Sequence, residues 1–304
     1  MLEIAPGLMV VVALFIDLFC GEPPVSVHPV VAIGKWLQYC GSWVRGGQTS
    51  VAAYLRGMLA WFLGASACIF LAFGLDLLLQ HLPLWLAIIL GGILLKPLLA
   101  WSMLRNEVRA VEQAFSEGLD AARIRLSYLV SRDTSDLDET EIRQSAIETL
   151  AENLNDSVVA PVFWFCLFGL PGAALYRFIN TADAMWGYRG QWEWAGKWSA
   201  QIDDVFSWIP ARLTAFLLLP LKWTQLQKIA SETPSPNGGW PMGAMALRLD
   251  ICLSKPDIYV LNADGRLPEA KDTMRALRAA GQSVFLICVA SMPLAAGINF
   301  LMNE

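Results

Sequence analysis

The stretch Val158–Ile179 reads VVAPVFWFCLFGLPGAALYRFI, and it decides how the chain folds. It is apolar over a length that crosses about 30 Å of hydrocarbon as a helix. Gly169-Leu-Pro-Gly172 at its middle is a strong turn signal. A straight crossing would place the polar residues on its two sides in different compartments. A helix break at membrane depth is tolerated where protein or water covers the backbone, so we predict a helical hairpin whose ends return to the same side.

The chain as a whole has the composition of an integral membrane protein. Of its 304 residues, 56% are hydrophobic and 16% charged, and the mean hydropathy is +0.47, which lies outside the range of ordinary soluble proteins. Further apolar tracts lie at Gly57–Leu79, Leu82–Trp101 and Ser283–Met302, with shorter ones at Ala5–Phe19 and Val205–Leu221. We predict one all-α polytopic membrane domain over residues 1–304. It should have about four to six apolar helical segments and a helical cytoplasmic domain formed by the loops.

The distribution of Lys and Arg sets the predicted orientation. Six of these residues lie in Ser102–Ser157 and eight in Lys222–Gly281, whereas the Gln80–His81 turn has none. Basic loops face the cytoplasm. We therefore expect residues 102–157 and 181–281 to be mainly cytoplasmic, with both termini outside.

Several kinds of site are not expected. No basic stripe indicates a nucleic-acid surface. The six cysteines are scattered without a CxxC pair and there are only two histidines, which argues against a zinc site. Neither GxxxxGK[ST] nor GxGxxG occurs, so a nucleotide would be held by something other than a P-loop or a Rossmann turn.

The polar loops are predicted to be mostly helical. Hydrophobic periodicity and acids that favour a helix N-terminus indicate helices at Leu104–Glu117, Asp138–Ser157, Met242–Leu253 and Pro268–Gly281. A short strand is predicted at Asp257–Leu261.

The helix Asp138–Ser157 carries the first candidate ligands. Glu148, Glu152 and either Asn155 or Asp156 recur at helical spacing and share one face. Like charges four residues apart repel, so a purely structural helix gains nothing from them. Mg²⁺ takes one or two carboxylates and leaves its other positions to water and phosphate. We predict an Mg²⁺ site on this face; a solvated acidic face is the alternative.

A second group of acids follows the hairpin tract. Asp183 and the pair Asp203-Asp204 suggest a second cluster that shares bridging cations with the acidic helix. Adjacent helical residues point about 100° apart. Only one member of the pair should therefore face the site, while the other orients an arginine or caps a helix.

Basic and amide groups complete the predicted site. Arg132, Arg189 and Arg212 offer guanidinium forks for phosphate or carboxylate; for Arg212 an interfacial snorkelling role is the alternative. The loop Ser235-Pro-Asn-Gly-Gly239 offers backbone N–H groups to a phosphate. His28 lies in a Pro-rich turn, where a lone histidine is more often structural than catalytic.

In this order, the motifs resemble the family of membrane adenosylcobinamide-phosphate synthases, or cobinamide synthases, of cobalamin biosynthesis. The resemblance covers almost the whole chain. The matching segments are Asp17 with Gly21-Glu-Pro23 and His28-Pro-Val30, then Ser131-Arg-Asp-Thr134, Glu148-Thr-Leu-Ala-Glu-Asn153, Asp156, Ala160-Pro161, Asn180-Thr-Ala-Asp183, Gly187-Tyr188, Asp203-Asp204, Pro210-Ala-Arg212 and Ser235-Pro-Asn237.

The resemblance implies an ATP- and Mg²⁺-dependent amide bond. It would join the corrinoid adenosylcobyric acid to (R)-1-aminopropan-2-ol phosphate, or a related amino alcohol, giving adenosylcobinamide phosphate. A carboxylate and a protonated amine do not condense at neutral pH, so the carboxylate must be activated, as in an acyl phosphate. The resemblance also implies a multi-pass protein of the bacterial inner membrane with a cytoplasmic active site, and other membrane enzymes of cobalamin assembly as partners.

Residue roles follow from the motifs and the resemblance together. The expected catalytic acids are Glu148, Glu152, Asp183, Asp203 and Asp204. The expected Mg²⁺ ligands are Glu148, Glu152, Asp156 and Asp203. Contacts to ATP and the other substrates are expected from Arg132, Asp133, Asn153, Asn180, Tyr188, Arg189, Arg212, Ser235, Asn237 and His28.

The chain departs from the family pattern at a few positions. Glu22 replaces a usual Asp, Gln201 a common Arg and Ser207 a common Asn, and Arg189-Gly190-Gln191-Trp192 is less charged than usual. A related non-synthase branch, linked to β-lactamase regulation, gives the alternative of a membrane sensor or accessory protein. Such a protein should lose the paired acids and the Ser-Pro-Asn loop, which this chain keeps. A corrinoid transporter is a further alternative, but it should place its ionisable residues at mid-span.

Overall fold

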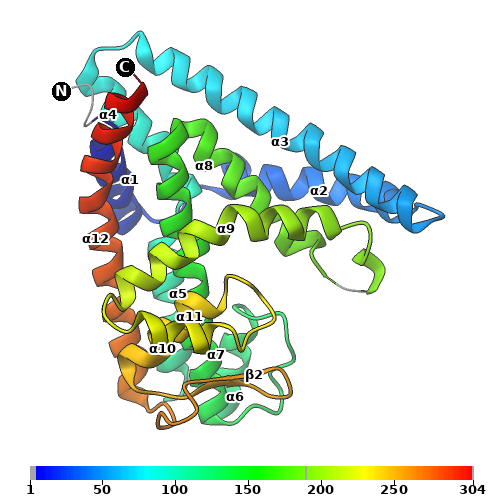
Figure 1. Cartoon of the computed structure of the whole chain (residues 1–304), viewed down its shortest axis with the longest axis vertical. Coiled ribbons are helices and arrows are strands. Elements are labelled where there is room, and N and C mark those ends of the chain that lie inside the picture. Colours follow the sequence, from blue (N-terminus) through cyan, green and yellow to red (C-terminus); the bar gives the residue numbers. More distant parts are fainter. Residues whose placement is uncertain (1–4, 189, 303–304) are drawn as a thin grey trace. The chain divides into compact units, whose positions relative to one another are not determined.

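Helices make up nearly all of the structure, a computed structural model that describes residues 5–188 and 190–302, with side chains through residue 293 (Figure 1). The first half of the chain forms α1 (Ala5–Cys20), α2 (Pro29–Arg45), α3 (Ser50–Gln80), α4 (Leu84–Leu95), α5 (Trp101–Ala114), α6 (Leu119–Ser127) and α7 (Glu139–Leu154). The second half forms α8 (Ala160–Trp186), α9 (Lys197–Leu218), α10 (Trp223–Ala230), α11 (Gly239–Leu249), strands β1 (Leu253–Lys255) and β2 (Tyr259–Leu261), and α12 (Ala270–Met302). Short helical turns are η2 (Val25–Val27), η3 (Lys96–Leu98), the π-helical η4 (Asn155–Val159) and η5 (Gly190–Trp192).

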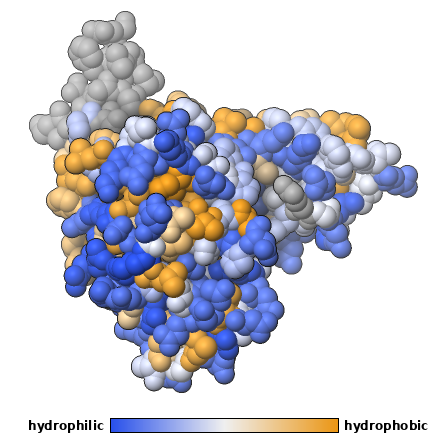
Figure 2. All heavy atoms as spheres, turned by 60° about the horizontal axis from the view of Figure 1, so that its bottom comes forward, coloured by the Kyte–Doolittle hydropathy of each residue, from blue (hydrophilic) through white to orange (hydrophobic). Residues whose placement is uncertain are grey.

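The chain divides into two compact units. One unit, here called the apolar unit, comprises Met1–Ala100, Ala160–Ser207 and Cys288–Glu304. The other, here called the polar unit, comprises Trp101–Val159 and Trp208–Ile287. The face of the molecule shown in Figure 2 is largely hydrophilic, with scattered apolar side chains.

Four helical stretches in the described residues are long and apolar enough to cross a membrane: Ser50–Gln80, Leu84–Ala114, Glu139–Trp186 and Ala270–Pro293. A shorter apolar helix spans Ala5–Cys20. In the third stretch the acid-rich α7 belongs to the polar unit, and the apolar residues begin at Val158. The predicted all-α polytopic membrane protein is therefore confirmed.

The predicted break in the hairpin tract is present in α8. Phe168 (φ −134°, ψ 17°) and Gly169 (φ 64°, ψ −154°) leave helical geometry, and a positive φ of this kind favours glycine. The chain folds so sharply that a side chain on Gly172 would collide with the carbonyl of Trp164, and Figure 1 shows α8 bending here. The backbone N–H of Leu170 donates to the Asp76 carboxylate of α3 at 3.2 Å, so this acid caps the second arm of the helix. That both ends face the same side of a membrane stays a prediction.

Close helix contacts build the apolar unit. The second arm of α8 packs on α2 and α3, with Leu37, Trp61, Phe178 and Trp186 in the buried cluster. Gly64 of α3 lies directly against Trp36 and Phe178 and leaves no room for a Cβ. Small residues at such crossings let helices approach closely, which suits packing in a bilayer.

Buried α7 is the centre of the polar unit. Its first turn has a complete capping box, in which Asp138 accepts from the Glu141 N–H at 2.8 Å and Glu141 accepts from the Asp138 N–H at 2.8 Å. The strands β1 and β2 pair antiparallel, with Lys255 opposite Tyr259. Gln144 fixes this hairpin to α7, because its amide donates to the Cys252 carbonyl at 3.1 Å.

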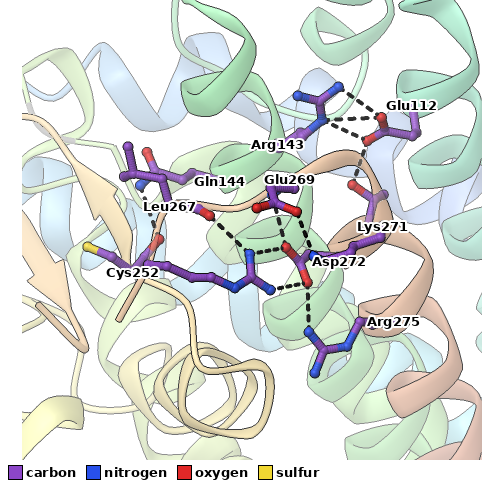
Figure 3. A network of polar contacts seen from close by, with 11 residues as sticks. Glu112, Arg143, Gln144, Cys252, Leu267, Glu269, Lys271, Asp272 and Arg275 are labelled. Carbon is purple, nitrogen blue, oxygen red and sulfur yellow. Dashed lines mark hydrogen bonds and ion pairs between the residues drawn. The ribbon is translucent and has the colours of Figure 1, made fainter. Parts of the chain in front are cut away.

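A polar network ties α5, α7 and α12 together within the polar unit (Figure 3). Glu112 accepts from Arg143 at 3.1 to 3.2 Å and from the Thr273 hydroxyl at 2.6 Å. Fully buried Asp272 accepts from Arg266 at 2.6 Å and from Arg275 at 2.9 Å. The contacts of Glu112 tie α7, the helix that carries the acidic face, to α5 and α12.

The predicted loop helices agree with the structure except at some boundaries. The helix predicted at Met242–Leu253 ends at Leu249, because Asp250 takes a left-handed conformation (φ 56°), and Leu253 begins β1. The helix predicted at Pro268–Gly281 and the last span form one continuous helix, α12. The sequence analysis did not predict α6 and α10, which are short.

Candidate functional site

A cavity of about 180 Å³ opens on the predicted acidic face of α7. Its walls come from α7, the segment before it, α11 and the strand pair, all within the polar unit. The lining residues are Leu129, Val130, Ser131, Arg132, Ser145, Glu148, Thr149, Glu152, Asn153, Met242, Lys255 and Tyr259. The structure thus brings together Glu148, Glu152, Arg132 and Asn153, as the sequence predicted.

Glu148 is the buried acid of this cavity. It is only 7% exposed, and its Oε1 has no hydrogen-bond partner among the described residues. Burial raises the pKa of its carboxyl to about 8, although Arg132, a hydrogen bond from the Tyr259 hydroxyl and Lys255 act in the opposite direction. The pKa of Tyr259 is raised too, first by burial and then by the nearby acids. The carboxylate of Glu148 is therefore a stronger base than that of an exposed glutamate.

Two basic side chains, Arg132 and Lys255, line the cavity. Arg132 donates to the hydroxyl of Ser145, one helical turn before Glu148. Lys255 lies in β1, which is fixed to α7 because the Ser254 hydroxyl donates to Gln144 at 3.2 Å. In the part of the chain described here, neither Arg132 nor Lys255 forms an ion pair.

Asp133 lies beside this segment but does not line the cavity. It is exposed, and its carboxylate accepts from the Ser135 N–H at 2.9 Å. This hydrogen bond lowers the pKa of Asp133. A hydrogen bond from the N–H two residues later is the contact by which an aspartate stabilises a turn.

The loop Ser235–Gly239 lies at the other side of the cavity, next to exposed Glu152. A Cβ on Gly238 would lie 3.3 Å from Oε1 of Glu152. The Arg212 guanidinium reaches this loop by donating to Asn237 Oδ1 at 3.1 Å and the Pro236 carbonyl at 3.4 Å. Arg212 and the loop, which the sequence analysis joined as a phosphate site, are therefore in direct contact.

Arg212 also contacts two aromatic rings. Its guanidinium carbon lies 4.2 Å from the Trp208 ring centre and 4.6 Å from that of Trp240. The loop N–H groups of Asn237 and Gly238 both donate to the Ser235 hydroxyl, at 3.2 and 3.1 Å. A phosphate would have to replace that hydroxyl as their acceptor.

The C-terminal end of the acidic face is structural in part. Asn155 is buried in the π-helical turn η4, donates to Asp156 Oδ1 at 2.8 Å and accepts from the Thr214 hydroxyl at 3.0 Å. Of the two alternatives after Glu152, half-buried Asp156 is the more accessible. Neither residue lines the cavity.

The remaining predicted residues belong to the apolar unit. Half-buried Asn180 and Asp183 lie on α8, exposed Tyr188 follows it, and Asp203-Asp204 lie on α9. Gly187 packs so closely on the Asp183 carboxylate that no side chain fits there. Asp203 accepts from Ser207 at 3.5 Å. Arg189 lies outside the described residues.

His28 has a structural position in the apolar unit. Its Nδ1 accepts from the Val30 N–H at 3.2 Å and caps α2. Its Nε2 must then carry the proton, and it lies 3.2 Å from Glu22. Glu22 also binds Lys96 at 2.7 Å, and Lys96 lies 3.4 Å from buried Asp17. The motif residues Asp17, Glu22 and His28 therefore meet in one partly buried polar network around Lys96.

No three His, Cys, Asp or Glu side chains in the described residues form a ready metal-binding group. The acids that face the cavity are Glu148 and Glu152. Two carboxylates suit Mg²⁺ that keeps water and phosphate in its other positions. The donor set thus fits a cation brought in with a phosphate.

Lys255, Tyr259 and Met242 were missed by the sequence analysis. They lie more than ninety positions after Glu148 in the chain, and only the packing of β1, β2 and α11 on α7 brings them near. The Tyr259 hydroxyl lies 3.8 Å from Met242 Sδ as well as beside Glu148. The sequence signal nearest to these residues was the strand predicted at Asp257–Leu261, which contains Tyr259.

Comparison with known proteins identifies the family. The model of the CobD/Cbib protein family matches residues 10–284. A probable cobalamin biosynthesis protein CobD of Pyrococcus furiosus is 39% identical over 275 residues, covering 88% of this chain and 91% of that protein. A cobalamin biosynthesis protein CobD of Dehalococcoides mccartyi is 36% identical over 271 residues, covering 85% of this chain and 87% of that protein. No solved structure matches. The chain therefore belongs to the CobD/Cbib family.

Proposed function

We propose that this chain is an amide-forming ligase of cobalamin biosynthesis that uses Mg²⁺ and ATP. It would join adenosylcobyric acid to (R)-1-aminopropan-2-ol phosphate, or a related amino alcohol, and yield adenosylcobinamide phosphate. The relatives named as cobalamin biosynthesis proteins support the pathway. The observation that carries the reaction type is the α7 cavity, in which the buried carboxylate of Glu148 lies among the cations of Arg132 and Lys255.

Amide formation requires a base for the amine. An ammonium must lose a proton before its nitrogen can attack an activated carboxyl carbon. Glu148 suits this role, because burial makes its carboxylate more basic and Oε1 has no other described partner. In the proposed step Glu148 takes one proton from the ammonium, the N–C bond forms, and the bond from the acyl carbon to the phosphate oxygen breaks. The leaving phosphate takes the second proton that the nitrogen releases.

Glu152 and the Ser235–Gly239 loop form the proposed nucleotide side of the site. Glu152 is exposed at the cavity rim and lies against Gly238. It would hold Mg²⁺ by one carboxylate, while Arg212 and the loop would contact phosphate oxygens. When bound, Mg-ATP supplies the phosphoryl group that activates the corrinoid carboxylate. Catalytic roles for Asp183, Asp203 and Asp204 stay predictions.

The proposed location is the bacterial inner membrane, with the polar unit in the cytoplasm. Glu193 of the η5 loop and Asp264 after β2 are both exposed. In a background without native cysteines, Glu193→Cys and Asp264→Cys should both resist an impermeant thiol reagent in intact cells. Labelling of the Glu193→Cys variant alone would reject the helical hairpin of α8. Labelling of the Asp264→Cys variant would reject a cytoplasmic site in the polar unit.

The activity is tested by coupled measurement of ADP release from purified protein. Mg-ATP, adenosylcobyric acid and aminopropanol phosphate should all be required, and mass spectrometry should detect adenosylcobinamide phosphate. Glu152→Gln should abolish product formation, whereas Glu117→Gln, an exposed acid away from the cavity, should not. A wild-type rate for Glu152→Gln would remove this residue from the site. No ADP release with all three substrates would reject the ligase.

A further inference from the structure

We infer that the inner end of the α7 cavity binds the small zwitterionic co-substrate, with its ammonium at Glu148 and its phosphate at Arg132 and Lys255. This inference rests on the proposed ligase function, and it divides the site in two. The inner end takes the amino-alcohol phosphate, and the rim at Glu152 takes the nucleotide phosphates.

The size of the cavity limits the ligand. At about 180 Å³ it is smaller than the roughly 300–1,000 Å³ of pockets that enclose drug-sized molecules. A nucleotide or a corrinoid is too large to be enclosed there. A compound of a few heavy atoms fits, so of the proposed substrates only the amino-alcohol phosphate suits this space.

The polar groups inside the cavity suit a ligand that carries both signs. Glu148 is 7% exposed, and its Oε1 lacks a hydrogen-bond partner among the described residues. Leaving such an oxygen unsatisfied costs about 1–3 kcal/mol, and more when it is charged. Arg132 and Lys255 line the same space without an ion pair in the part of the chain described. A bound ammonium would satisfy the acid, and a bound phosphate would satisfy the two cations.

The spacing along α7 suits such a molecule. Arg132 is held at Ser145, and Glu148 follows three residues later, which is about 4.5 Å along the helix axis. In a phosphorylated vicinal amino alcohol only three atoms separate nitrogen from phosphorus, so the two are about 5 Å apart. The cation end and the acid end of the cavity therefore match the two ends of the ligand.

The β1–β2 pair holds the second cation in the same cavity. Ser254 and Cys252 bind Gln144, the neighbour of Ser145, and Lys255 follows Ser254 directly. Its cross-strand partner Tyr259 hydrogen-bonds to Glu148. The β1–β2 pair thus supplies a phosphate contact and a contact to the acid that receives the ammonium.

The test is binding by isothermal titration calorimetry to the full chain in detergent, without ATP, using three probes. They are 1-aminopropan-2-ol phosphate, 1-aminopropan-2-ol without phosphate, and isopropyl phosphate without the amine. Glu148→Gln should weaken the full probe at least tenfold, or about 1.4 kcal/mol, and leave isopropyl phosphate unchanged. Lys255→Met should weaken the full probe and isopropyl phosphate but not the free amino alcohol. Glu117→Gln and Lys228→Met, both exposed and away from the cavity, are the matched controls.

The outcomes separate this inference from the proposed function. If both variants weaken all probes equally, or neither weakens the full probe, the inference is wrong even where ADP release by the wild-type chain confirms the ligase. If the crossed pattern appears but no ADP is released, the zwitterion site stands and the ligase does not. Changes at Glu148 or Lys255 that alter only the KM for ATP would assign the inner end to the nucleotide and overturn the inference.

Discussion

Glu148→Gln tests whether the acid in the α7 cavity is protonated in the folded protein without ligand. Burial raises its pKa from an ordinary value of 4.5 to about 8. Between these values the folded protein binds more protons than the unfolded chain, so the free energy of unfolding falls as the pH rises and levels off above about 8. Gln cannot titrate, so the variant lacks this contribution.

The size of the effect follows from the shift. Each pKa unit corresponds to about 1.4 kcal/mol. Between pH 5.5 and 8.5, wild-type protein should therefore lose about 3 kcal/mol of stability relative to Glu148→Gln. Gln resembles the neutral form of the acid in size, so the variant should be the more stable protein at pH 8.5.

The assay is unfolding in detergent at a series of pH values, followed by tryptophan fluorescence in buffer with a chelator. Glu117→Gln serves as the control, because this acid is exposed and outside the cavity. A Glu148→Gln difference that does not vary with pH, or that changes in the opposite direction, would show that Glu148 is ionised in the folded state and would refute the reasoning.

Three further predictions concern the neighbouring structure. Arg212→Lys keeps the charge but loses the two-pronged contact with the Ser235–Gly239 loop. The KM for one phosphorylated substrate should therefore rise at least about tenfold, or about 1.4 kcal/mol. Unchanged kinetics would leave Arg212 as a structural residue. Gly169→Ala should destabilise the α8 break by about 1 kcal/mol or more because of its positive φ, seen as a lower midpoint of thermal unfolding, and an unchanged midpoint would contradict the strained turn. Glu112→Met removes one partner of the half-buried Glu112–Arg143 pair and should lower the free energy of unfolding by about 3 kcal/mol. Adding Arg143→Met should recover part of this loss. Additive losses in the double-mutant cycle would show that the pair is not coupled.

The sequence by itself was enough to predict the elements whose signals are local. Long apolar tracts predicted the membrane helices, the Gly-Leu-Pro-Gly turn predicted the break in α8, and Asp138 predicted the start of α7. The i, i+4 spacing placed Glu148 and Glu152 on one face. These features depend on helical period, hydrocarbon length and capping, which a few consecutive residues specify.

The tertiary structure alone decided what surrounds those residues. Burial of Glu148, and with it the raised pKa, requires the β1–β2 pair and α11 to pack on α7. Lys255 and Tyr259 lie opposite each other because of the register in which β1 and β2 pair. Arg212 contacts Asn237 because α9 packs beside the Ser235–Gly239 loop. Such contacts join residues far apart in the chain. No local pattern predicts them, because burial and charge interactions depend on distances that only the folded chain sets.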